Sequence, residues 1–152
     1  MAAHDYVFVS RWHVAAPREE VAAILADAEA LPRWWGEVYL AVTAESGGVY
    51  RVWSRGWLPY TLKWRFERTR DDRPRGFSLR AWGDLDGTGD WEFRENGDVI
   101  FTWRVRADKP LLRSLSWLLK PVFAANHRWA MARGEEALGR ELIRRRLLSE
   151  VR

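Results

Sequence analysis

Residues 60–69, YTLKWRFERT, set the pattern that decides the fold, and three later segments repeat it: GFSLRAWGDL (76–85), GDWEFRE (89–95) and VIFTWRVRA (99–107). Apolar and polar residues alternate along each segment, as they do in a β-strand with one buried and one solvated face. One set of positions is rich in Trp and Phe, whereas the other holds Arg, Lys, Glu and Ser. The four segments therefore predict an antiparallel sheet with an aromatic face and an ionic face.

Three further strands are predicted ahead of these four. Residues 6–14 are aromatic and β-branched, and residues 37–44 and 48–58 alternate in the same way. In the last two segments apolar residues occupy both sets of positions, so the pattern leaves open whether Tyr50 or Arg51 points inward. The sequence thus predicts about seven strands, counting the first.

Tight turns are predicted at Asp86-Gly87 and Asn96-Gly97, because both dipeptides readily adopt positive φ. Residues 84–95 also place Asp, Asp, Gly and Glu at positions 1, 3, 6 and 12 of a calcium-loop template. That template needs a helix on each side, whereas the flanking segments alternate as strands. A hairpin is therefore preferred to a calcium site.

Helical spacing appears on both sides of the predicted sheet. Residues 17–31 place apolar side chains on one helical face, and Pro32 is expected to end that helix. Residues 111–119 form a short apolar segment up to Pro121, and residues 122–146 predict a long amphipathic helix. The expected architecture is α+β, with a curved sheet of about seven strands around the C-terminal helix and small helices between strands one and two.

Composition limits the chemistry. The 152 residues, with 47% apolar and 30% charged residues, suit one domain over residues 1–152 with its own core. There is no Cys for a thiolate or a Cys-bound metal, and the three His residues are scattered, so no metal and no cofactor are expected. Acids lie among the bases and the net charge is only +4, which argues against a nucleic-acid partner. No signal peptide or membrane span is recognised, so a cytoplasmic protein without membrane contact is expected.

The count of 11 Trp exceeds what packing alone requires in a domain of this size. One interpretation of the inner sheet face is that its flat rings fill a core. The other is that, together with apolar side chains of the last helix, they line a cavity for a small molecule, and both can hold at once. The candidate ligand-binding residues are Trp35, Leu62, Trp64, Phe66, Phe77, Leu79, Trp91, Phe101, Trp103, Phe123, His127 and Met131.

His127 is the candidate catalytic residue. It lies on the apolar face of the predicted C-terminal helix. One interpretation is a core histidine with satisfied hydrogen bonds, and the other is a cavity-facing general acid or base, for which an ordinary pKa near 6.5 is suited. No second catalytic group stands at a definable spacing from it.

Four stretches carry a resemblance to a known family: APREEVAAILADAEALPRWW (16–35), GWLPYTLKW (56–64), WGDLDGTGDWEF (82–93) and NHRWAMARGEEAL (126–138). With this order of elements, the chain from about Val7 to Leu142 resembles the START-related polyketide cyclase/dehydrase superfamily (SRPBCC), which has the helix-grip fold. The superfamily includes cyclases, hydrolases, lipid and quinone carriers, hormone receptors and co-chaperones. The resemblance therefore implies the fold and an internal cavity, but no single reaction.

Two functions follow as expectations. The first is binding of a hydrophobic, aromatic or polycyclic small molecule, with cofactor-independent cyclisation or dehydration of the polyketide cyclase kind if the protein is an enzyme. The second is a non-catalytic carrier or regulatory protein that binds a lipid or quinone. Neither the identity of the ligand nor the oligomeric state follows from the sequence.

Overall fold

The computed structural model describes residues 5–56, 61–106 and 116–150, and it contains one antiparallel sheet in the order β1-β7-β6-β5-β4-β3-β2. Its strands are β1 (Asp5–His13), β2 (Tyr39–Ala44), β3 (Val49–Arg55), β4 (Thr61–Asp72), β5 (Gly76–Gly83), β6 (Asp86–Phe93) and β7 (Asp98–Arg106). The predicted seven-stranded sheet is confirmed. All six strand pairs are antiparallel.

The helical segments are α1 (Arg18–Ala26), η2 (Ala28–Ala30), α2 (Leu31–Trp34), η3 (Ser46–Gly48) and α4 (Ser116–Glu150). The expected single helix over residues 17–31 is wrong in detail, because Asp27 leaves the helical region at φ −82° and ψ 83°. Pro32 does not end a helix. It lies in the first turn of α2, where a missing amide hydrogen has no helical partner to lose.

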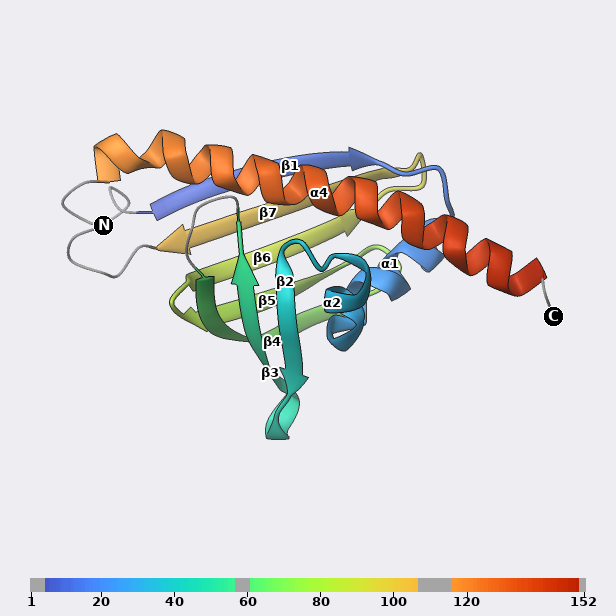
Figure 1. Ribbon diagram of the computed structural model, residues 1–152, viewed down its shortest axis with the longest axis horizontal. Helices are drawn as coiled ribbons and strands as arrows, with labels where there is room; N and C mark the ends of the chain where they lie inside the picture. The colour runs from blue at the N-terminus through green and yellow to red at the C-terminus, as the bar shows by residue number, and fades with distance from the viewer. Residues whose placement is uncertain (1–4, 57–60, 107–115, 151–152) are drawn as a thin grey trace.

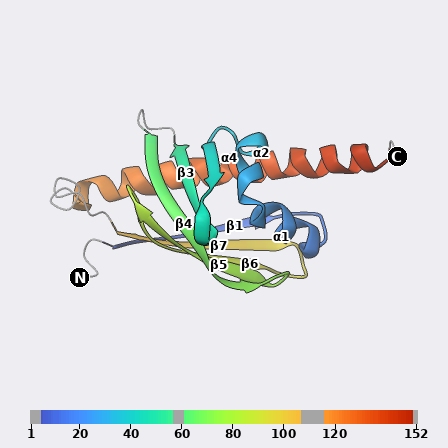
Figure 2. The ribbon, with the colours of Figure 1, turned by 90° about the horizontal axis from the view of Figure 1, so that it is seen from below.

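Helix α4 runs along the concave face of the sheet and extends past its edge (Figure 1). Seen from below, β2 and β3 rise beside α4 while β5, β6 and β7 lie beneath it, so the sheet curls around the helix (Figure 2). Pro121 lies inside α4, although the sequence pattern places it between two segments. Residues 111–115 of the predicted apolar segment lie outside the described residues. Among the described helices, none has both the length and the apolar character of a membrane span.

The alternation correctly predicts which side of β4 to β7 is buried. Trp64, Trp91 and Trp103 are buried and face inward, with the ionic residues between them on the outside. The orientation left open for β3 is now settled, because Val52 and Ser54 are buried whereas Arg51 is exposed.

The turn at Asn96-Gly97 is confirmed, with Gly97 at φ 96°. The turn predicted at Asp86-Gly87 is wrong by two residues, because both belong to β6 and pair with β7. Gly87 is needed for a different reason: a Cβ there would overlap the carbonyl oxygen of Arg104. Asp84 forms the turn instead, and its carboxylate accepts a hydrogen bond from the Lys63 amide at 3.0 Å.

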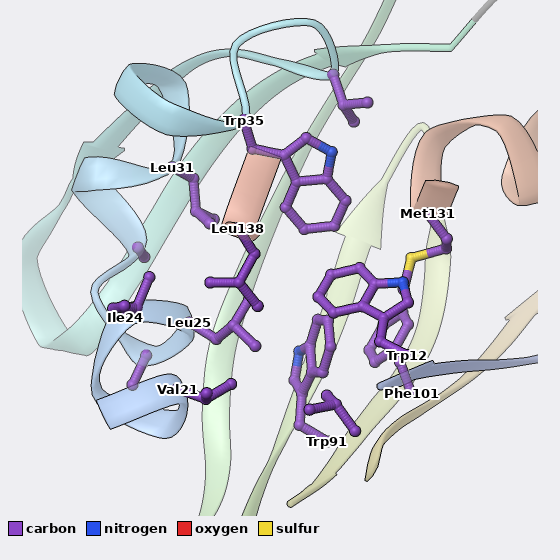
Figure 3. Close-up of a cluster of buried hydrophobic side chains, with 14 of the residues drawn as sticks. Trp12, Val21, Ile24, Leu25, Leu31, Trp35, Trp91, Phe101, Met131 and Leu138 are labelled. Atoms are coloured by element: carbon purple, nitrogen blue, oxygen red, sulfur yellow. The ribbon is translucent and has the colours of Figure 1, made fainter. Parts of the chain in front are cut away.

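A buried cluster joins α1 and α2 to the sheet and to the middle of α4 (Figure 3). Beside it, α2 and α4 are held together by Glu141, which is only 3% exposed and receives hydrogen bonds from Arg33, Arg144 and Arg145. Burial raises the pKa of Glu141, but the three guanidinium groups outweigh that effect and hold it well below its usual range. This end of α4 is therefore fixed to the small helices.

Candidate functional site

A cavity of about 640 Å³ lies between the concave sheet face and α4. Its volume is within the range of small-molecule sites, and its wall is mostly apolar with few polar groups, as such sites usually are. The lining residues are Tyr6, Phe8, Trp35, Val38, Tyr39, Ser54, Arg55, Gly56, Thr61, Leu62, Trp64, Leu79, Asp84, Leu85, Trp91, Phe101, Trp103, Val105, Arg106, Val122, Phe123, Asn126, His127, Ala130 and Met131.

The structure places ten of the twelve candidate ligand-binding residues in this wall. They are Trp35, Leu62, Trp64, Leu79, Trp91, Phe101, Trp103, Phe123, His127 and Met131. The other two are buried elsewhere. Phe66 stacks on Tyr50 at 5.1 Å, and Phe77 packs against Trp91 and Phe93 beneath the guanidinium of Arg68.

The sheet side of the wall is a continuous layer of rings. Trp91 and Phe101 are direct partners across β6 and β7, and their ring centroids lie 4.3 Å apart. Phe101 stacks on Trp103 at 5.7 Å, and Trp103 lies 6.0 Å from Trp64. Gly89 makes this layer possible, because a Cβ there would come within 3.0 Å of both Phe101 and Trp103. The rings thus form a continuous aromatic wall on the sheet side of the cavity.

Trp35 closes the opposite side by bridging α2 to α4. Its indole nitrogen donates a hydrogen bond to the carbonyl of Ala130 at 3.2 Å. Gly134 permits this approach, since a Cβ at that position would overlap the Trp35 ring. Trp35 is buried and also lines the cavity, so it both packs the helices together and forms part of the wall.

His127 faces the cavity from α4. Its Nε2 atom lies 3.2 Å from Oγ of Ser10, and its ring stacks on Phe8 at 4.9 Å. Burial lowers the pKa of the imidazole from 6.5 to about 4, because the surroundings penalise the charged form. At neutral pH the ring is therefore uncharged, and it is suited to hydrogen bonding more than to taking up a proton.

Two further polar groups in the wall are also uncharged. Trp64 donates its indole hydrogen to Oγ of Ser54 at 2.9 Å. Burial raises the pKa of Tyr39 to about 12, so its hydroxyl stays protonated. The interior thus offers neutral hydrogen-bonding groups between aromatic rings.

Charged residues gather at one end of the cavity. Arg55, Asp84 and Arg106 are exposed lining residues, and each stands where a strand ends. The antiparallel pairing brings these positions to the same edge of the sheet. Exposed charged side chains therefore line this end of the cavity, whereas its apolar residues lie farther along the sheet.

The sequence interpretation missed several lining residues, including Tyr6, Phe8, Tyr39, Ser54 and Ala130. A signal was present for the first two, because Tyr6, Phe8, Ser10 and Trp12 alternate along β1 on the side that faces α4. Ser54 and Ala130 have no distinguishing pattern. No group of metal-binding side chains is found within the described ranges.

Comparisons with known proteins agree with this fold. The model of a family described as polyketide cyclase/dehydrase and lipid transport matches residues 7–142. No curated protein matches the sequence significantly.

Solved structures show the same fold at low sequence identity. The Zhui aromatase/cyclase from Streptomyces sp. R1128 is 18% identical, with a TM-score of 0.71 over 93% of this chain and 96% of that chain. A protein from Thermus thermophilus is 22% identical, with a TM-score of 0.69 over 87% and 96%. The di-domain ARO/CYC BexL from the BE-7585A biosynthetic pathway is 14% identical, with a TM-score of 0.67 over 89% of this chain and 50% of its own. Because the family model spans nearly all of the sheet and most of α4, the chain belongs to the polyketide cyclase/dehydrase and lipid transport family.

Proposed function

We propose that the protein binds a flat hydrophobic small molecule, aromatic or polycyclic, inside the cavity. The observation that carries this proposal is the cavity of about 640 Å³ whose wall includes four Trp side chains: Trp35, Trp64, Trp91 and Trp103. A planar ligand buried there would stack on rings and lose its contact with water, and both effects favour binding. The family description, which combines cyclases with lipid transport, is consistent with a hydrophobic ligand.

Whether the ligand is also transformed separates two versions of this function. Cyclisation or dehydration of a polyketide-like substrate is supported by the family and by the aromatase/cyclase neighbours. A non-catalytic carrier or regulatory protein for a lipid or quinone is supported by His127, whose pKa of about 4 makes it a weak base at neutral pH. Both versions need the same cavity.

A matched pair of variants on α4 tests the binding. Ala130 lines the cavity, whereas Ala132 is exposed on the same helix two residues later. Ala130→Phe is expected to fill the cavity and weaken binding of fluorene and fluorenone by about tenfold or more, measured by quenching of Trp fluorescence. Ala132→Phe is expected to leave both affinities unchanged. Equal affinities in the two variants and the parent, or no binding to the parent, would refute the proposal.

A separate experiment tests whether the protein transforms the compound that it binds. Native mass spectrometry of the purified protein would reveal a compound that copurifies with it, and that compound then serves as the first substrate to be tried. With it, His127→Ala distinguishes the two versions: a product lost while binding is retained favours an enzyme. Release of the compound unchanged by the parent protein favours the carrier.

A further inference from the structure

The last turns of α4 extend beyond the body of the protein. In Figure 1 the helix continues past the edge of the sheet, and Leu142 is its last buried residue among those described. Three large apolar side chains follow: Ile143 is 59% exposed, Leu147 is 57% exposed and Leu148 is 53% exposed. None of the three belongs to the buried core cluster or packs against it. These side chains therefore contribute nothing to the core.

Arginine residues surround these apolar side chains. The helix end, residues 140–150 with the sequence RELIRRRLLSE, contains four Arg and two Glu. One of the two acids, Glu141, is buried beneath Arg144 and Arg145. Those two arginine side chains nevertheless remain 46% and 36% exposed, and Arg140 has no ion pair among the described residues. The surface of the helix end is therefore cationic as well as apolar.

The spacing of the apolar side chains does not suit a protein groove. A helix that docks in such a groove places apolar anchors at i, i+4 and i+7 along one face. Ile143 and Leu147 occupy the first two of these positions, but the third is Glu150. One turn before Ile143 the same face carries Gly139 and Arg140. The apolar seam is therefore only two residues long.

An anionic bilayer surface fits both properties of the helix end. A second copy of the chain would bring the same cationic surface against this one, and like charges repel. A lipid surface instead supplies anionic headgroups for the arginines and an interface that accepts aliphatic side chains at any spacing. With 100° per residue, Arg140 and Arg144 lie between Ile143 and Leu148 around the helix. Their long stems let the guanidinium groups stay among the headgroups while the apolar neighbours enter.

We propose that the helix end is a docking site for an anionic membrane surface, which it binds reversibly through Ile143, Leu147, Leu148 and the arginines beside them. The site is separate from the cavity wall, and its apolar side chains lie beyond Leu142, where the match to the family model ends. It therefore goes beyond the proposed function. It also replaces the expectation, drawn from the sequence, that the protein has no membrane contact.

Cosedimentation of the full chain with lipid vesicles tests the apolar part of the site. The parent is expected to bind vesicles of phosphatidylcholine and phosphatidylserine in equal parts about tenfold more tightly than vesicles of phosphatidylcholine alone. Ile143→Ser/Leu147→Ser is expected to weaken binding to the anionic vesicles about tenfold or more. The matched control is Val7→Ser/Val9→Ser, on the outer face of β1, where the two side chains are 50% and 66% exposed. The control is expected to change binding less than about twofold.

Two single variants on the same helix test the charge. Arg140→Gln is expected to weaken binding to the anionic vesicles about fivefold, whereas Arg128→Gln, also exposed on α4 but outside the helix end, is expected to change it less than about twofold. Binding of the parent should also weaken as salt is added, because salt screens the arginines from the headgroups. All four variants are expected to melt close to the parent, since each changes only exposed side chains.

Several outcomes would overturn the proposal. They are no binding of the parent to the anionic vesicles at low salt, equal binding to both kinds of vesicle, and equal losses in a variant and its control. A dimer in light scattering that Ile143→Ser/Leu147→Ser converts to a monomer would overturn it too, because the helix end would then meet a second copy. Ala130→Phe alters the cavity but not the helix end, so it is expected to bind vesicles like the parent. Vesicle binding and small-molecule binding can therefore fail independently.

Discussion

His127 gives the fold a pH dependence that follows from its burial. The folded chain lowers the pKa of the imidazole to about 4, whereas the unfolded chain exposes it to water with a pKa of about 6.5. Between these values the unfolded state binds a proton that the native state does not bind, so the free energy of unfolding falls as the pH falls. The contribution of the neutral, buried imidazole to the free energy of unfolding is fully present above pH 6.5, is lost progressively toward pH 4, and is absent below pH 4.

The size of the effect can be worked from the same shift. One proton over this window corresponds to about 3 kcal/mol at most, since each pH unit is worth about 1.4 kcal/mol. The ring faces a cavity that admits water, which reduces the penalty on its charged form. We therefore expect protonation linked to His127 to lower the free energy of unfolding by about 2 kcal/mol between pH 7.5 and pH 4.5.

Urea unfolding followed by Trp fluorescence measures this contribution when the protein is compared with His127→Gln, which keeps a polar group near Ser10 but cannot titrate. With an m-value of about 2 kcal/mol/M, the midpoint of the parent should fall about 1 M more than that of the variant over the same pH change. Asp71 does not confuse the comparison, because the hydrogen bond from Arg73 lowers its pKa to about 2. Equal shifts in the two proteins, or an imidazole that titrates near pH 6.5 in NMR spectra of the folded chain, would refute the reasoning.

Two further predictions concern α4. Gly134→Ala should destabilise the protein by about 1–3 kcal/mol because the new methyl group overlaps Trp35. Gly139→Ala, with open space around it, should stabilise the protein by up to about 1 kcal/mol through helix propensity; thermal melts that rank the two variants the other way would contradict the packing described for Trp35. Glu141→Gln should cost about 2 kcal/mol in urea unfolding, since it leaves three arginine side chains without their shared carboxylate. Glu136→Gln, on the exposed side, should have little effect, and a similar loss in both variants would show that burial of the carboxylate is unimportant.

The sheet and its inner face could be predicted because alternation is a local property of each strand. Trp64, Trp91 and Trp103 all stand at positions that point inward in any regular strand, and the structure keeps them there. The turn at Asp86-Gly87 could not be placed, because a glycine required by a close strand approach looks the same in sequence as one required by a turn.

The candidate site was predictable to the extent that it coincides with the inner face. Phe66 and Phe77 share that face but not the cavity, because the sheet curls and α4 covers only part of it. The contact between His127 and Ser10 joins residues 117 positions apart, and no local sequence pattern around either residue predicts it. The pKa of His127 depends on this same long-range packing.

The bond from Trp35 to the carbonyl of Ala130 divides α4 into two halves with different support. In a regular α-helix that carbonyl accepts the amide hydrogen of residue 134, so the indole competes for it at the point where Gly134 removes a side chain. The half beyond this point is anchored through Glu141, while the half before it forms the roof of the cavity. Residues 130–134 therefore mark the place where α4 passes from the stretch that borders the cavity to the stretch that is tied to the small helices.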